Sequence, residues 1–333
     1  MEFIKNLVEL NPVMPYIILF VGFVMLVKGA DLFVDGSASL ARKLGISAAI
    51  VGLTIVAMGT SAPEAAVSIS GGIQETFFGQ EGKIDMAIGN IIGSNLFNLL
   101  FILGISMMIH PIPTSKDFLK RDFPWAVLTT LLFIPMIWDG KLVLWEGIAL
   151  LALFVIYIGW MIYKSIKNRE VGEEIKTISM PKSIIFLLVG LIMIVLGSQF
   201  VLESAQNIAY TFGMSSTLVG LTICAIGTSL PELVTSFIAA RKGESEIAIG
   251  NVVGSNIFNL LFILGTTITI SNPMPSNFNF LIDTIILLFA TALVYLFAYT
   301  RKRCGRIEGA TIFIIYLGYF AYIIIRDLPA IMA

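Results

Sequence analysis

The chain has 333 residues, of which 57% are hydrophobic and only 13% are charged, and its formal net charge is -1. Its mean hydropathy of +0.92 is too high for a water-soluble domain, and apolar stretches of about 20 residues, long enough to cross a hydrocarbon core, recur along it. The composition therefore predicts an integral membrane protein whose main partner is the lipid bilayer, and the nearly neutral charge gives no indication of a nucleic-acid partner.

In chain order, the hydropathy pattern predicts a short interfacial segment over residues 1–13 and then ten membrane-spanning helices. The predicted spans are 14–40, 47–74, 85–109, 122–138, 142–164, 182–210, 215–240, 246–270, 279–300 and 308–326. The only sizeable polar stretch, residues 165–181, is interpreted as a linker between a first five-helix unit, 14–164, and a second, 182–333. The N-terminal residues have no basic stretch and no small-residue cleavage site, so no cleaved signal peptide is expected.

Two motifs occur twice. VGLTIVAMGTSAPE at residues 51–64 and VGLTICAIGTSLPE at 219–232 agree at 11 of 14 positions. AIGNIIGSNLFNLLFILG at 87–104 and AIGNVVGSNIFNLLFILG at 248–265 agree at 15 of 18. Five predicted spans separate the equivalent motifs, and because five is odd the two copies must cross the membrane in opposite directions. The sequence thus predicts an all-α membrane protein in which ten transmembrane helices form two inverted-topology five-helix repeats, a plan that places binding sites near the midplane.

The basic residues predict the orientation. Sixteen lysines and arginines fall in the predicted connections on the side of the 165–181 linker, and four, Lys5, Lys83, Lys141 and Arg326, fall on the other side. Because cytoplasmic loops carry the excess of basic residues, the linker is expected to be cytoplasmic and both termini extracellular.

Each copy of the first motif places a proline and a glutamate within an apolar stretch. Pro63 lacks an N–H and clashes with the carbonyl four residues earlier, so it frees the carbonyl of Gly59, and Pro231 acts in the same way in the second copy. Freed carbonyls inside a membrane need protein or ion partners. Glu64 and Glu232 are costly at this depth, and by default such carboxylates indicate an ion or proton site.

Further oxygen ligands share these helix faces. They are Thr60, Ser61, Thr228 and Ser229 in the first motif and Asn90, Ser94, Asn98, Asn251, Ser255 and Asn259 in the second. This set has no imidazole, and its one thiol, Cys224, is not duplicated, so it suits Ca²⁺, Na⁺ or Mg²⁺ rather than Zn²⁺ or copper, with Ca²⁺ favoured by flexible geometry. One Ca²⁺ or two Na⁺ would neutralise two glutamates. Without a cation the two carboxylates would not both stay ionised, so protons should compete with the metal.

Helix packing and local ion pairing are the structural alternatives to ion binding for the polar residues of these spans. A single Gly-Thr-Ser in a membrane helix usually serves helix packing, but duplication together with a glutamate favours a site. In the first span, Lys28, Asp31 and Asp35 have no duplicated counterparts, and an i,i+3 pair of Lys28 with Asp31 is favoured over a gating role. His110 is interpreted as an interfacial residue, and Cys224 as a packing residue.

At these motifs the sequence resembles the Ca²⁺/cation antiporter superfamily, and within it the prokaryotic Na⁺/Ca²⁺ exchangers. The resemblance implies that Glu64 and Glu232 are the central Ca²⁺ ligands, assisted by the carbonyls of Thr60 and Thr228. The residues that it implies as ligands of flanking Na⁺ positions are Ala57, Ser61, Ser94, Ala225, Ser229 and Ser255. It also implies that Asn98 and Asn259 line the middle position.

The activity implied by the resemblance is Na⁺-driven Ca²⁺ export by alternating access, with the long spans one and six sliding across the core. The chain is then expected to be a monomer in a prokaryotic plasma membrane, to need no cofactor and not to be an enzyme. An H⁺/Ca²⁺ antiporter of the same fold is the main alternative. Members of that branch usually carry a glutamate in the Gly-Asn motif of the third and eighth spans, whereas this chain has Asn98 and Asn259 in that region, which favours Na⁺ as the counter-ion. Asn259, an aspartate in some relatives, argues against K⁺ dependence. A channel would need a filter repeat, and an intramembrane enzyme a nucleophile–base pair or metal dyad; the sequence shows neither.

Overall fold

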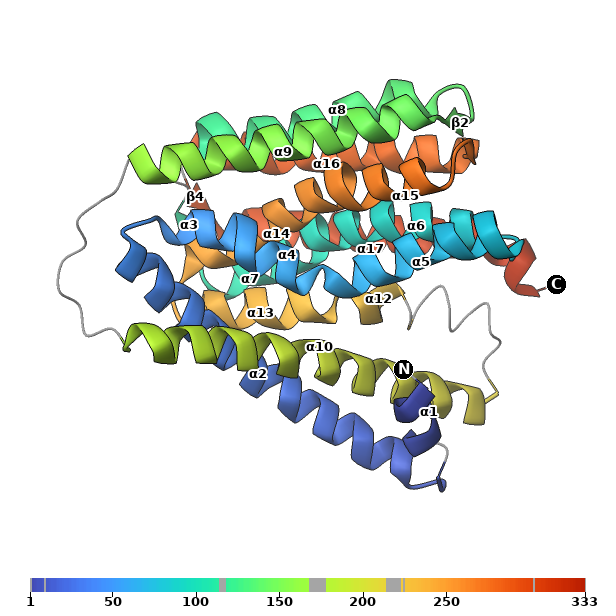
Figure 1. Cartoon of the computed structure of the whole chain (residues 1–333), viewed down its shortest axis with the longest axis horizontal. Coiled ribbons are helices and arrows are strands. Elements are labelled where there is room, and N and C mark those ends of the chain that lie inside the picture. The colour runs from blue at the N-terminus through green and yellow to red at the C-terminus, as the bar shows by residue number, and fades with distance from the viewer. Residues whose placement is uncertain are drawn as a thin grey trace.

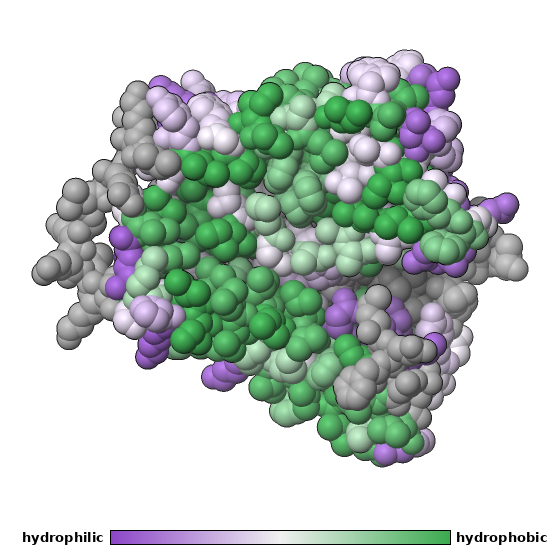
Figure 2. Space-filling view, viewed as in Figure 1, coloured by the Kyte–Doolittle hydropathy of each residue, from purple (hydrophilic) through white to green (hydrophobic). Residues whose placement is uncertain are grey.

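The computed structural model describes residues 2–8, 10–113, 118–167, 178–213, 223, 225–301 and 303–332. They form a bundle of long helices, most of whose axes lie along the long axis of the molecule (Figure 1). Cys224 and most of the predicted linker, residues 168–177, lie outside the described residues. Hydrophobic side chains cover most of the visible face, and hydrophilic ones gather toward the two ends of the helices (Figure 2), as expected for a membrane-embedded bundle.

The first half of the chain contains a short N-terminal helix, several membrane-length helices and two short strands. Its elements are α1 (Glu2–Val8), α2 (Met14–Leu44), α3 (Ala48–Val51), η1 (Gly52–Val56), α4 (Ala57–Thr60), α5 (Ala62–Phe78), α6 (Lys83–Leu96), η2 (Phe97–Ile102), α7 (Leu103–Ile109), β1 (Ile112–Pro113), η3 (Phe118–Asp122), α8 (Phe123–Ile137), β2 (Lys141–Leu142) and α9 (Leu144–Lys167). The η segments are single π-helical turns within longer helices.

The second half follows the same order. Its elements are α10 (Met180–Thr211), α12 (Ala225–Thr228), α13 (Leu230–Arg241), α14 (Ser245–Phe258), η5 (Asn259–Ile263), α15 (Leu264–Ile270), β3 (Met274–Pro275), α16 (Phe278–Arg301), β4 (Arg303–Cys304) and α17 (Arg306–Met332). Short antiparallel pairs, β1 with β4 and β2 with β3, join connections of the two halves at opposite ends of the bundle (Figure 1).

Seven described helices are long and apolar enough to cross a membrane, or eight if the bent pair of α3–α4 with α5 is one span. The protein is therefore a multi-pass membrane protein. The predicted span 122–138 appears as α8, whose 15 residues reach only about 22 Å at the rise of an α-helix. The predicted span 215–240 lies partly outside the described residues, which include only α12 and α13 from it.

The centre of the bundle is formed by the helices that carry the second motif. The helix over Lys83–Ile109 is 78% buried across its most apolar window and that over Ser245–Ile270 is 94% buried, whereas the other long helices range from 28% to 39%. Small residues permit this close packing: a Cβ added to Gly254 would lie 2.6 Å from the carbonyl oxygen of Leu53. The two repeated motifs are thus pressed against each other at the core.

Helices α2 and α10 lie side by side along one edge of the bundle (Figure 1). Gly22 and Gly29 on α2 face Gly197 and Gly190 on α10, and at each of these glycines an added Cβ would lie 2.9 Å or less from the carbonyl oxygen of the glycine opposite. The helices therefore touch backbone to backbone, in the manner of small-residue interfaces between membrane helices. We call these four glycines the glycine seam.

Candidate functional site

The two predicted glutamates lie where two helices break. α4 ends at Thr60 and α5 restarts at Ala62, at an angle of 50°. Proline follows at the second position of each new helix, where its missing N–H is tolerated, and Glu64 and Glu232 occupy the first turns of α5 and α13. Both glutamates are buried, with 1% and 0% of their surface exposed. Each carboxylate thus sits at the positive end of a helix dipole.

The hydrogen bonds of the two carboxylates cross between the halves. The Ser61 hydroxyl donates to Glu232 Oε1 at 2.7 Å, and the Ser229 hydroxyl donates to Glu64 Oε1 at 2.8 Å. These serines are the residues at which the two helices break. Each break therefore supplies the hydroxyl that donates a hydrogen bond to the glutamate of the other half. The contact brings together four of the predicted site residues.

The serines of the second motif join the same cluster. Ser94 Oγ lies 3.1 Å from Ser229 Oγ. Ser255 Oγ lies 3.5 Å from Glu232 Oε1 and donates to the Ala57 carbonyl at 3.4 Å. The carbonyl of Ala57 is therefore at the site, while the side chain of Ala225 lies outside the described residues.

The two predicted threonines are held by amides of the opposite half. The Thr60 hydroxyl donates to Asn251 Oδ1 at 2.9 Å, and the Thr228 hydroxyl donates to Asn90 Oδ1 at 3.3 Å. The Thr60 hydroxyl also lies near Glu232 and the Thr228 hydroxyl near Glu64, so each threonine is close to the carboxylate of the opposite half. The asparagines are anchored in turn by serines, Asn251 by Ser236 at 2.9 Å and Asn90 by its counterpart Ser68 at 3.0 Å.

Asn98 and Asn259 are both buried, at 1% and 0% exposure. Their amide nitrogens donate to Asn256 Oδ1 at 3.2 Å and to Asn95 Oδ1 at 2.9 Å, respectively. Sequence reasoning did not single out Asn95 and Asn256, nor the anchoring serines. The signal was available, since Asn95 and Asn256 are the third residues of the duplicated Gly-Ser-Asn.

Four buried oxygens of these residues have no hydrogen-bond partner among the residues that the structure describes. They are Glu64 Oε2, Glu232 Oε2, Asn98 Oδ1 and Asn259 Oδ1. Neither glutamate forms an ion pair with a basic side chain in the part of the chain that the structure describes. Buried polar atoms are almost always satisfied, and an unpaired buried carboxylate is strongly unfavourable. Two carboxylate and two amide oxygens, one of each from either half, can therefore accept a cation as a ligand set without breaking a hydrogen bond. They are hard ligands of the kind that Ca²⁺ and Na⁺ accept.

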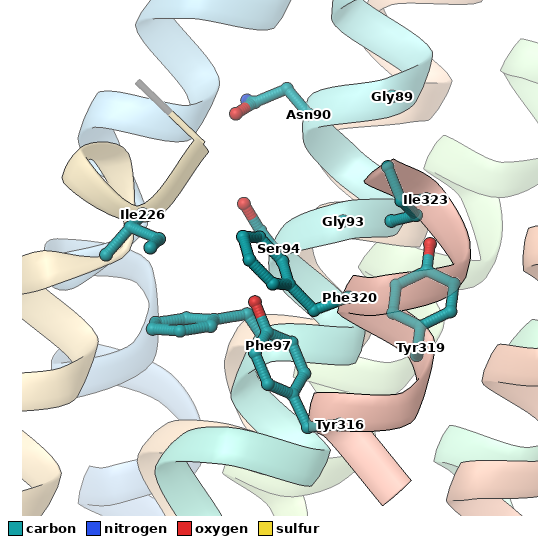
Figure 3. A pocket seen from close by; sticks show the side chains of 10 residues that line it. All are labelled: Gly89, Asn90, Gly93, Ser94, Phe97, Ile226, Tyr316, Tyr319, Phe320 and Ile323. Carbon is teal, nitrogen blue, oxygen red and sulfur yellow. The ribbon is translucent and has the colours of Figure 1, made fainter. Parts of the chain in front are cut away.

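A cavity of about 70 Å³ opens beside this cluster, between α6, α12 and α17 (Figure 3). It is lined by Gly89, Asn90, Gly93, Ser94, Phe97, Ile226, Tyr316, Tyr319, Phe320 and Ile323. Asn90 and Ser94 project from α6 into a space otherwise walled by aromatic and aliphatic side chains (Figure 3). The volume is enough for about two water molecules, so the Ser94 side of the cluster adjoins space that a small solute can enter.

The predicted pairing in the first span is wrong. Asp31 lies 2.8 Å from Lys242 Nζ and Asp35 lies 2.7 Å from the same atom, while Lys28 has no ion pair among the described residues. Lys242 follows α13, so it ties α2 to the turn before α14, where Arg42 also pairs with Glu244 at 3.0 Å. The i,i+3 spacing of Lys28 and Asp31 does not predict the ion pair, because Lys242, from a distant part of the chain, lies next to Asp31 instead.

His110 lies apart from the cluster. The His110 ring nitrogen Nδ1 lies 3.2 Å from Ser245 Oγ, at the first residue of α14. Among the described residues no three His, Cys, Asp or Glu side chains gather as they would around a transition metal. The cluster is thus built from carboxylates, hydroxyls, amides and carbonyls.

Comparison with known proteins agrees with this geometry. The family model described as sodium/calcium exchanger protein matches residues 14–163 and 182–325. The putative antiporter CaxA of Alkalimonas amylolytica is 38% identical over 315 residues, which are 91% of this chain and 96% of that protein. The sodium/calcium exchanger MaX1 of Methanosarcina acetivorans is 30% identical over 347 residues, covering 91% of this chain and 97% of its own.

A solved structure gives the same result. The sodium-calcium exchanger NCX_Mj, soaked with 10 mM Na⁺ and 10 mM Sr²⁺, matches with a TM-score of 0.81 and 30% identity, covering 92% of this chain and 97% of that chain. The chain belongs to the sodium/calcium exchanger family of membrane antiporters.

Proposed function

We propose that this protein exchanges Na⁺ for Ca²⁺ across the membrane by alternating access, with both ions competing for the cluster around Glu64 and Glu232. The observation that carries the proposal is the set of four buried oxygens without partners, two from carboxylates and two from amides. Two ionised glutamates bring a charge that one Ca²⁺ or two Na⁺ can neutralise. Na⁺ rather than H⁺ is supported by the likeness to proteins described as sodium/calcium exchangers and by amides at Asn98 and Asn259.

The proposed ligand roles follow the positions of the cluster. Glu64 and Glu232, with the carbonyls of Thr60 and Thr228, bind Ca²⁺. The proposed ligands of the flanking Na⁺ positions are Ala57, Ser61, Ser94, Ala225, Ser229 and Ser255. Asn98 and Asn259 add their amide oxygens to the middle position. The crossed bonds of Ser61 and Ser229 support these roles, because the same hydroxyls can turn from a carboxylate to a bound ion.

The proposed architecture has ten spans in two inverted five-helix repeats, 14–164 and 182–333, joined by the 165–181 linker. Two observations support it. The contacts of the cluster come in equivalent pairs from the two halves, and α1 and the end of α17 lie at the same end of the bundle, as an even number of crossings requires (Figure 1). We place the linker in the cytoplasm of a prokaryotic cell, both termini outside the plasma membrane, and the protein as a monomer that needs no cofactor.

In the proposed cycle α2 and α10 slide across the core and open the site to one face at a time. The glycine seam supports motion of these two helices together. Binding a cation between the four unpartnered oxygens neutralises the glutamates, which lowers the cost of moving the site past the low-dielectric core. No chemical step is required, and the related proteins are likewise named as exchangers or antiporters.

The test is uptake of radioactive Ca²⁺ into proteoliposomes loaded with Na⁺, with K⁺, or with a pH gradient imposed. We expect saturable uptake only with internal Na⁺. Uptake driven by the pH gradient alone would reassign the protein as an H⁺/Ca²⁺ antiporter, and uptake without any counter-ion would indicate a channel.

The site itself is tested by Glu64→Gln, which keeps the shape of the side chain but removes its charge. We expect this variant to lose Ca²⁺ uptake, because a neutral amide cannot offset the charge of a divalent ion in a dry site. Glu81→Gln is the matched control, since Glu81 is exposed in the turn between α5 and α6. Near-normal uptake by Glu64→Gln would refute the assignment.

A further inference from the structure

We propose that Asn95 and Asn256 are positioning residues. They turn the side-chain oxygens (Oδ1) of Asn259 and Asn98 toward the transported cation. Neither residue contacts the glutamates through any hydrogen bond of the described chain; each acts through an asparagine of the opposite repeat. This inference rests on the proposed function, since it concerns the orientation of ligands in the same cation site.

The central helices α6 and α14 are clamped by a reciprocal pair of hydrogen bonds. Asn95 Nδ2 donates to the Asn256 carbonyl at 3.2 Å, and Asn256 Nδ2 donates to the Asn95 carbonyl at 3.0 Å. Both side chains are buried, with 0% and 4% of their surface exposed. A backbone carbonyl can only accept, so the atom facing it must be the amide nitrogen. The orientation of both amides is therefore determined by the backbone.

The orientation of Asn95 and Asn256 determines which end of the Asn259 and Asn98 amides faces them. With Nδ2 of Asn95 and Asn256 committed to the backbone, their Oδ1 atoms remain as acceptors. Asn95 Oδ1 accepts from Asn259 Nδ2 at 2.9 Å, and Asn256 Oδ1 accepts from Asn98 Nδ2 at 3.2 Å. An acceptor selects the donor end of the next amide. The side-chain nitrogens of Asn259 and Asn98 are thereby engaged, and their Oδ1 atoms keep no hydrogen bond among the described residues. In the proposal these Oδ1 atoms face the cation.

The result coincides with the unpartnered atoms. Asn98 Oδ1 and Asn259 Oδ1 are the two amide oxygens without hydrogen bonds in the buried cluster. A flipped amide would aim two N–H donors at the cation and set an oxygen against an oxygen behind it, which loses a buried hydrogen bond and leaves acceptors unpaired. The relay from backbone to Asn95 to Asn259, and its mirror through Asn256 to Asn98, excludes that flip.

The relay also accounts for an amide at position 259. An ionised aspartate there has no N–H to offer Asn95 Oδ1, so two acceptors would face each other in a buried site. Accommodating it would require a proton on the aspartate or rotation of Asn95, which breaks the clamp to Asn256. Asn259 is therefore matched to Asn95 in this chain.

The test is a set of double-mutant cycles on Ca²⁺ affinity, measured by Ca²⁺ binding to the full-length protein in detergent. Leucine has nearly the shape of asparagine without its amide. Asn95→Leu removes both side-chain hydrogen bonds of Asn95, and we expect the loss of the one that orients Asn259 to weaken Ca²⁺ binding about tenfold. Asn95→Leu combined with Asn259→Leu should weaken it no more than the worse single variant, because they belong to one relay.

The matched control is on the same helix. Asn95→Leu combined with Asn98→Leu should weaken binding by the product of the single effects, since Asn98 is held by Asn256 and not by Asn95. A purely structural role for Asn95 would give the same coupling in both cycles, and that result would overturn the proposal. Melting curves without Ca²⁺ identify loss of folding. If a leucine variant does not fold, Asn95→Ser, which is polar but too short to reach the neighbouring helix, replaces it in both cycles.

Different results would overturn the proposed function and the positioning role of Asn95. If Glu64→Gln binds Ca²⁺ like the unaltered protein, the proposed function is wrong. If Glu64→Gln abolishes binding while Asn95 couples no more to Asn259 than to Asn98, the cation site stands and the positioning role is refuted.

Discussion

Lys242 provides a direct test of the proposed movement of α2. Its Nζ lies 2.8 Å from Asp31 and 2.7 Å from Asp35, and we call these three side chains the Lys242 bridge. The bridge fastens α2 to the turn between α13 and α14, so it exists only in arrangements of α2 close to the one described. Lys242→Met keeps the length and apolar stem of the side chain and removes its charge.

The expected effect is moderate. The Lys242 side chain is 26% exposed, and those of Asp31 and Asp35 are 47% and 52% exposed, so each pair is screened and contributes about 0.2–1 kcal/mol. Together the two contacts stabilise the described arrangement by about 1 kcal/mol, which corresponds to about a fivefold change in population. We expect Lys242→Met to reduce the population of this arrangement by that factor.

The assay is electron paramagnetic resonance distance measurement between spin labels at Lys43→Cys on α2 and Lys164→Cys on α9, with the two native cysteines replaced by serine. Arg241→Met is the control, since it removes a neighbouring positive charge that has no ion pair among the described residues. High salt should bring the unaltered protein toward the Lys242→Met distribution, because exposed pairs are screened. Identical distributions for Lys242→Met, Arg241→Met and the unaltered protein would refute the reasoning.

The bridge also predicts a direction with pH. Partial burial lowers the pKa of Lys242, but its hydrogen bonds to Asp31 and Asp35 outweigh that effect, so the pKa lies above the ordinary lysine value. A raised pKa means that the bridge contributes fully below the ordinary lysine value and is lost as pH rises through the higher one. The described arrangement should therefore become less populated only in strongly alkaline solution, and Lys242→Met should abolish that change.

Two further predictions concern packing and the ion ligands. Gly190→Ala places a Cβ 2.6 Å from the Phe33 backbone nitrogen, so overpacking of about 1–3 kcal/mol should lower the apparent melting temperature in detergent. Gly159→Ala, which has no described atom within 4 Å of the new Cβ, should leave the melting temperature unchanged. Equal melting temperatures for both variants would contradict the close contact at the glycine seam. Ser61→Ala removes the 2.7 Å hydrogen bond to Glu232 and a proposed Na⁺ ligand, so the Na⁺ concentration for half-maximal Ca²⁺ release should rise about tenfold; an unchanged Na⁺ titration would remove this serine from the site.

The duplicated motifs predict that Glu64, Glu232, Ser61 and Ser229 lie close together, and the structure brings these four residues into contact. Glu64 and Glu232 are buried together because each motif repeats the same helix break, and a break with a proline can be read from one sequence. The crossing of partners could not be read in the same way. Ser61 bonds to Glu232 rather than to the nearby Glu64, and that choice depends on how the two halves face each other.

The misjudged residues show the same limit. Asp31 was assigned to Lys28 from local helix spacing, yet Lys242, 211 positions away, supplies the cation. Nothing in its local sequence distinguishes Asn95, whose proposed role depends on a hydrogen bond to the backbone carbonyl of Asn256 in the other half of the chain. Local spacing carries information on faces of one helix and none on which distant helix meets that face.

The glycine seam has a consequence for leakage. Gly29 and Gly190 bring the backbones of α2 and α10 into direct contact, with no side chain between them that could yield independently. In the proposed cycle the two helices, one from each repeat, therefore travel as a single rigid body. Because the two helices are antiparallel and belong to the proposed inverted repeats, a displacement that uncovers the route on one face would cover the equivalent route on the other. In the proposed cycle this contact would therefore prevent the two entrances from being open at once, which would keep ions from leaking down their gradients.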